Sequence, residues 1–153
     1  MALERRFKCG YSAPVSLLLD QPVIRARVRR ISAYSVRPER PLRIGDSEPE
    51  PDISVVRGEP NDWLERHPST AELVVEISVS TIDTDVEKAD IYAEAGVPEY
   101  WLVRPEQAEV DVYLAPANGR YTEKVTLRGA DTLHCGSIAG VEVKLGDLFA
   151  VRA

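Results

Sequence analysis

The chain has 153 residues, 44% of them hydrophobic and 29% charged, which is the composition of one globular domain and excludes a disordered chain. The net charge is −6 at pH 7, but residues 1–43 carry +7 (ten Lys and Arg against three Asp and Glu), which leaves −13 for residues 44–153. This acidic remainder argues against strong non-specific binding of nucleic acid unless a cation intervenes. No apolar run is long enough for a membrane span or a signal peptide, so we expect a cytoplasmic protein without a membrane partner. Cys9 and Cys135 lack CxxC spacing and are expected to be reduced thiols.

The first 40 residues have weak periodicity and are treated as a basic N-terminal segment, with a single domain following at residues 41–153. Residues 23–31 alternate apolar and basic side chains and could form a strand, which Pro38 and Pro41 would end. The Arg-rich segment either contacts phosphates or is a poorly ordered leader, and the composition leaves both open. We expect it to be the least packed part of the chain. If residues 23–31 do form a strand, its apolar face could be buried in a homodimer.

From residue 52 onward the pattern of strands and helices is clear. Residues 52–56 (DISVV) and 72–78 (ELVVEIS) have the apolar, β-branched composition of buried strands, and the loop between them has room for one helical turn near residues 63–66. Residues 80–83 offer N-cap side chains for a helix that runs to about Ala95, where Gly96 and Pro98 supply the stop. Residues 100–103 (YWLV) then form a strand that the helix makes a crossover partner of residues 72–78.

The C-terminal third predicts further strands. Residues 110–114 alternate apolar and polar side chains as a half-buried strand does. Asn118-Gly119 predicts a tight hairpin that pairs residues 121–127 back antiparallel. Residues 141–145 are expected to complete the sheet. The resulting fold class is α/β (α+β-like), a mixed β-sheet flanked by helices.

Two acids stand next to apolar strands. Strand alternation places Glu76 on one face with Glu72, Val74 and Ser78, and an unpaired carboxylate there is costly to bury. The ordinary interpretations are that Glu76 faces water and that Asp52, after Pro51, is a turn residue. As a pair on neighbouring strands, however, the two carboxylates could share one hard cation such as Mg²⁺, with a backbone carbonyl such as that of Ile77 as a further ligand.

The helix adds a third group. Asp85, Lys88 and Tyr92 share one of its faces by their spacing. An exposed lysine paired with Asp85 or Glu87 is the common outcome for such a position. A lysine that reaches back over the preceding strand could instead pair with Glu76, orient a water and stabilise charge on a phosphate.

Four segments together resemble the Uma-type restriction endonucleases, bacterial members of the PD-(D/E)XK nuclease superfamily. They are PLRIGDSEPEPD at residues 41–52, LVVEIS at 73–78, DVEK at 85–88 and GVPEYWLV at 96–103. The resemblance runs from about Arg40 to Phe149. It implies a restriction-endonuclease-like core and an endonuclease that hydrolyses DNA phosphodiester bonds with Mg²⁺ or Mn²⁺.

The resemblance also implies roles for individual residues. Asp52 is the motif's aspartate and Glu76 its second acid, and the motif's lysine, which Ser78 replaces on the strand, is supplied from the helix by Lys88. Asp52, Glu76 and the Ile77 carbonyl would bind the metal, which polarises the phosphate and lowers the pKa of a water. Ser78, Asp85 and Tyr92 would support the site.

The N-terminus departs from the family pattern, because residues 1–37 match nothing that we recognise in the family's N-terminal region. The resemblance therefore implies an atypical or truncated N-terminus. Two alternatives to a nuclease stay open: a catalytically silent nuclease-fold module that binds a protein or nucleic acid, and an unrelated sheet protein whose acids are all solvated.

Overall fold

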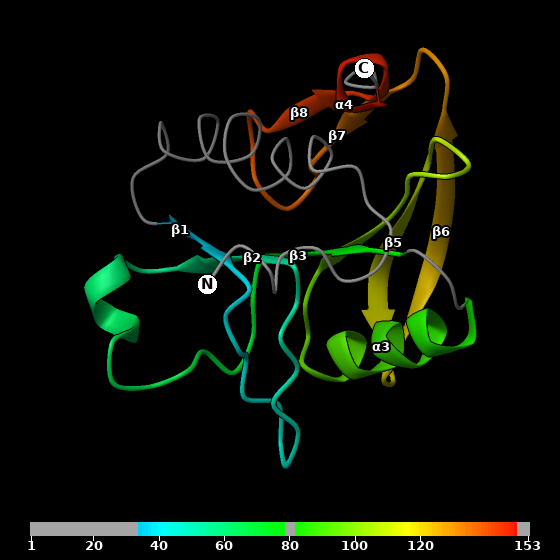
Figure 1. Cartoon of the computed structure of the whole chain (residues 1–153). Helices are drawn as coiled ribbons and strands as arrows, with labels where there is room; N and C mark the ends of the chain where they lie inside the picture. The colour runs from blue at the N-terminus through cyan, green and yellow to red at the C-terminus, as the bar shows by residue number, and fades with distance from the viewer. Residues whose placement is uncertain (1–33, 79–81, 150–153) are drawn as a thin grey trace.

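A six-stranded sheet in which the strands follow chain order dominates the structure, a computed structural model that describes residues 34–78 and 82–149 (Figure 1). Helix α3 lies on one face of this sheet, and a small two-stranded sheet with helix α4 lies on the other. The elements are β1 (Tyr34–Pro38), β2 (Ile53–Arg57), the 3-10 helix η2 (Pro60–Trp63), β3 (Leu73–Ile77), α3 (Ile82–Glu94), β4 (Glu99–Arg104), β5 (Glu109–Ala117), β6 (Arg120–Arg128), β7 (Thr132–His134), β8 (Glu142–Lys144) and α4 (Leu145–Phe149).

The predicted mixed sheet is confirmed. Strands β3 and β4 are parallel and joined by α3, whereas all other neighbours in the sheet are antiparallel. Helix α3 ends as expected at Gly96, which has a φ of +73° and lets the Val97 amide donate to the Tyr92 carbonyl. The β5–β6 hairpin turns at Asn118 and Gly119, both with positive φ, as the pair predicts.

Each face of the sheet has its own apolar core. Alternation along β3 sends Leu73 and Val75 to the face covered by β7, β8 and α4, and sends Val74 to the face covered by α3. Tyr92 of α3 packs there against Tyr100, with the ring centroids 5.3 Å apart. Because both faces of β3 and β4 are covered, a polar side chain on these strands needs a partner.

Three features differ from the sequence-based expectations. Strand β1, which was not predicted, pairs with β2 at the edge of the sheet and lies inside the segment assigned to residues 1–40. The prediction that residues 141–145 complete the main sheet is wrong, because β8 pairs only with β7. The helical turn expected near residues 63–66 occurs slightly earlier, as η2. The strand expected at residues 23–31 lies outside the described residues.

A buried carboxylate fastens the small sheet to the large one. Glu99, at the start of β4, is 1% exposed and accepts hydrogen bonds from the indole of Trp101 (2.8 Å) and the amide of Ser137 (3.1 Å). The thiol of Cys135 donates to the same carboxylate, and burial raises the pKa of this thiol to about 11. The other cysteine, Cys9, lies outside the described residues.

Replacing Glu99 should destabilise the fold. In Glu99→Ala the indole of Trp101 and the amide of Ser137 lose their acceptor in a buried place, and the free energy of unfolding should fall by about 2–4 kcal/mol. Urea unfolding followed by tryptophan fluorescence measures this loss. Glu123→Ala, at an exposed position on β6, is the control and should change little. A Glu99→Ala variant as stable as the parent would contradict the proposed fastening.

Candidate active site

Asp52 lies immediately before β2, opposite β3. The pair Ile53 and Val75 is in register, so the next opposed pair is Asp52 and Glu76. The Ile77 amide donates to Asp52 Oδ2 at 2.7 Å, and the Glu39 amide donates to the Asp52 carbonyl at 3.0 Å. Asp52 is therefore held at its carboxylate by β3 and at its carbonyl by Glu39.

Glu76 is buried on the α3 face of β3. It is 5% exposed, so the interpretation that this carboxylate simply faces water is wrong. Tyr92 donates its hydroxyl to Glu76 Oε1 at 2.8 Å, and Lys88 places Nζ 3.5 Å from Oε2. The two oxygens of Glu76 thus have different partners, one neutral and one cationic.

Helix α3 supplies both partners of Glu76. Lys88 and Tyr92 are four residues apart and so lie one turn apart on the same face. Tyr92 is fully buried, whereas the Lys88 side chain keeps 37% of its surface exposed. The predicted grouping of Asp52, Glu76, Lys88 and Tyr92 is therefore what the structure brings together.

The pKa of Glu76 is raised from 4.5 to about 7, first by burial and second by the charge of Asp52. Lys88 and Tyr92 lower this pKa but compensate only in part. Burial and the neighbouring Glu76 raise the pKa of Tyr92, which stays a neutral donor. Asp52 and Glu76 carry two potential negative charges, and the ammonium of Lys88 balances one of them. Binding of one more positive charge beside them is therefore favourable.

The donor set fits a hard divalent cation. Asp52 and Glu76 supply carboxylate oxygens, and the carbonyl of Ile77 belongs to the residue whose amide already holds Asp52. Mg²⁺ favours one or two carboxylates together with water. Within residues 34–78 and 82–149 there is no group of three or more His, Cys, Asp and Glu that could hold a metal, so the candidate is a two-carboxylate site.

The remaining predicted supporting residues contribute less. The Ser78 amide donates to the Val103 carbonyl at 2.8 Å and so extends the pairing of β3 with β4 beyond Ile77. Asp85 is among the residues whose side chains fall outside the described part of the structure. No helix in that described part is long and apolar enough to span a membrane.

One acid on the same face was missed. Asp111 is 3% exposed, although its alternation with Val110 and Val112 suggested a solvated position. Register places it in one row with Glu76, separated only by Leu102. The sequence carries no signal for its burial, because that depends on Arg104 and Thr126 from the neighbouring strands.

Comparisons with known proteins agree with this fold. A family model described as "Uma2: Putative restriction endonuclease" matches residues 12–146 and so extends well into the N-terminal segment that was expected to be atypical. The crystal structure of a putative nuclease belonging to DUF820 from Anabaena variabilis ATCC 29413 superposes with a TM-score of 0.77. The two chains are 20% identical over 92% of this chain and 81% of the other. A search of curated proteins finds no match.

Glu76→Gln should stabilise the protein in the presence of a chelator, increasingly so at higher pH. Native Glu76 binds a proton up to about pH 7, whereas the unfolded chain loses it near 4.5, so this residue's contribution to stability falls as pH rises through that window. Glutamine does not titrate, and the stability gain should reach at most about 3 kcal/mol at pH 8.

Urea unfolding of the two proteins between about pH 5 and pH 8 measures this difference. Glu87→Gln, at an exposed position on the same helix, is the control and should give a difference that does not depend on pH. A Glu76→Gln variant whose stability falls relative to the parent as pH rises would show that the surroundings do not raise the pKa of Glu76.

Proposed function

Because the chain belongs to the Uma2 family of putative restriction endonucleases, we propose that it is a Mg²⁺- or Mn²⁺-dependent endonuclease that hydrolyses DNA phosphodiester bonds. The observation that carries the proposal is the convergence of Asp52, Glu76 and Lys88, from two strands and one helix, on one place at the sheet. Carboxylates beside a lysine are the groups that metal-assisted phosphodiester hydrolysis needs.

Each residue has a defined task in this reaction. Asp52, Glu76 and the Ile77 carbonyl hold the cation, which when bound supplies Lewis-acid polarisation of the phosphate and a more acidic water. Tyr92 fixes one oxygen of Glu76 by its hydrogen bond, and the Ile77 amide fixes one oxygen of Asp52. These hydrogen bonds set the orientation of both carboxylates before substrate arrives.

Lys88 acts on the water or on the phosphate. Its ammonium is 3.5 Å from Glu76 Oε2, and its exposed fraction of 37% leaves it accessible to a substrate. In the superfamily motif the lysine follows the second acid by two residues, where this chain has Ser78. The contact with Glu76 supports the proposal that a lysine from α3 takes over that position.

Lys88→Met should separate metal binding from catalysis. The substitution removes the ammonium but not the carboxylates, so Mn²⁺ affinity should stay within a few-fold while plasmid nicking falls by about 10²-fold or more. Lys88→Arg should not restore the rate, because a planar guanidinium cannot replace a compact ammonium beside a water. Asp52→Asn should lose metal affinity and cleavage together. Calorimetric Mn²⁺ titration and supercoiled-plasmid nicking give the two readouts.

Two outcomes would count against this mechanism. Unchanged nicking by Lys88→Met would refute the helix-borne lysine. A parent protein that cleaves no DNA with any divalent cation would leave the fold in place and favour the catalytically silent nuclease-fold module.

A further inference from the structure

A network of polar side chains continues the row of Glu76 across the sheet. Register aligns Glu76 with Leu102, Leu102 with Asp111, and Asp111 with Thr126, so all four lie on the α3 face. We call the polar residues of β4, β5 and β6 in and beside this row the β4–β6 strip. They are Arg104, Glu109, Asp111, Lys124, Thr126 and Arg128.

Asp111 is at the centre of the strip. Its Oδ1 accepts hydrogen bonds from Arg104 Nη2 (3.0 Å) and Thr126 Oγ1 (2.7 Å), and Lys124 Nζ is 3.8 Å from Oδ2. Arg104 Nη2 also donates to Glu109 Oε2 at 2.9 Å. Tight hydrogen bonds thus connect the inner members of the network across three strands.

The acidic side chains of the strip are largely buried, and two of its basic side chains are exposed. Its acids lie inside, with the Asp111 and Glu109 side chains 4% and 19% exposed, whereas Lys124 and Arg128 are 52% and 67% exposed. Their contacts with the acids are also long, at 3.8 Å for Lys124 and 3.5 Å for Arg128. The solvent-exposed surface of the strip is therefore cationic, although its three basic and two acidic side chains sum to only +1.

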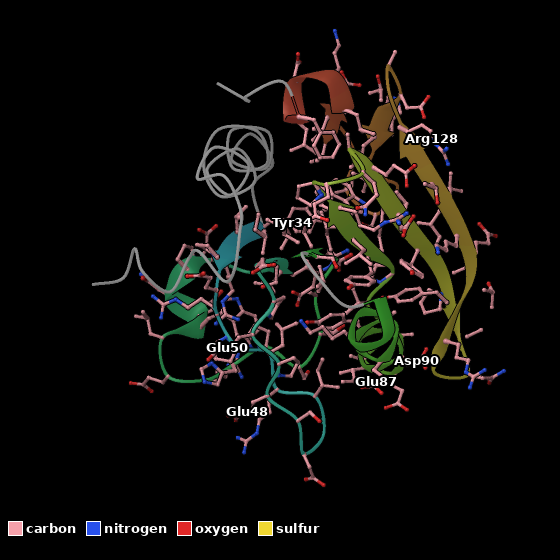
Figure 2. All side chains as sticks on the ribbon, turned by 45° about the vertical axis from the view of Figure 1, so that its right-hand side comes forward. Tyr34, Glu48, Glu50, Glu87, Asp90 and Arg128 are labelled. Atoms are coloured by element: carbon pink, nitrogen blue, oxygen red, sulfur yellow. The ribbon has the colours of Figure 1, made fainter. Side chains whose placement is uncertain are left out.

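Two acids of α3 lie away from Arg128. Figure 2 shows Glu87 and Asp90 at the helix, and Arg128 at the end of β6 that is farther from it. Lys88 lies on the sheet side of α3, against Glu76. Basic side chains therefore lie on both sides of Leu102. Lys88 is next to the candidate metal site, and Lys124 and Arg128 are on the edge strand β6.

We propose that the β4–β6 strip binds the phosphate backbone of duplex DNA and positions one strand at Asp52 and Glu76. This inference rests on the proposed function for its partner. Neighbouring strands are about 4.8 Å apart, so the row from Glu76 to Thr126 spans about 14 Å. That distance corresponds to about four phosphates of one DNA strand, at about 3.4 Å of helix axis each.

The alternative is a network that only ties the three strands together. The inner members already do this, because Arg104 and Thr126 both donate to Asp111 Oδ1, whereas Lys124 approaches only Oδ2, at 3.8 Å. Replacing only the two outer cations therefore separates DNA binding from folding.

The test is binding of a fluorescein-labelled DNA duplex of about 20 base pairs to the full chain in chelator, measured by fluorescence anisotropy over a range of salt. Chelator prevents cleavage, so the result does not depend on the proposed catalysis. Lys124→Gln/Arg128→Gln should weaken binding about tenfold and reduce the slope of log K against log salt by about two. Arg120→Gln/Lys144→Gln is the matched control, because it removes the same charge from exposed positions away from the strip. It should leave affinity within about twofold of the parent.

The outcomes separate the two proposals. Parent-like binding by the strip variant, equal losses in both variants, or no DNA binding by the parent protein would each overturn the strip. Unfolding of the strip variant, detected by its melting temperature, would show that the network is structural and would also overturn it. Failure to nick plasmid with metal, combined with the expected binding result, would refute the endonuclease and leave the strip as a DNA-binding surface.

Discussion

The burial of Glu76 beside Asp52 is the constraint around which the rest of the site is arranged. Burial of Glu76, and next to it the repulsion from Asp52, favour protonation of Glu76 up to about pH 7. Tyr92 and Lys88 offset part of this cost, and both come from the helix that connects β3 to β4. The crossover connection thus returns the chain to the face of the sheet that carries the acid, which is why one short segment can provide both the carboxylate and its partners.

A second buried glutamate, Glu99 on the neighbouring strand β4, has a different use on the other face of the sheet. Glu99 is as deeply buried as Glu76, but indole, amide and thiol donors surround its carboxylate. It joins two sheets. Glu76 has one neutral donor, one ammonium at 3.5 Å and a second carboxylate nearby. A buried acid beside a second carboxylate is the better candidate for binding a cation.

Local periodicity was sufficient to predict much of the site. Alternation along β3 placed Glu76 opposite Leu73 and Val75, and the four-residue spacing placed Lys88 and Tyr92 on one helical face. What it could not predict depends on pairing between distant segments. Strand β1 is short and carries Arg37 and Pro38, so only its pairing with β2 identifies it. Likewise β8 looks like a strand of the main sheet, and only its register with β7 shows otherwise.

The most direct test is whether Asp52 and Glu76 share one cation. Crystals of the protein soaked in Mn²⁺ would give an anomalous difference map in which the ion is located independently of any assay of cleavage. We expect one strong peak within about 2–2.5 Å of oxygens from both carboxylates, next to the carbonyl of Ile77. A map without a peak at this position, or with the only ordered ion elsewhere on the surface, would contradict the metal site.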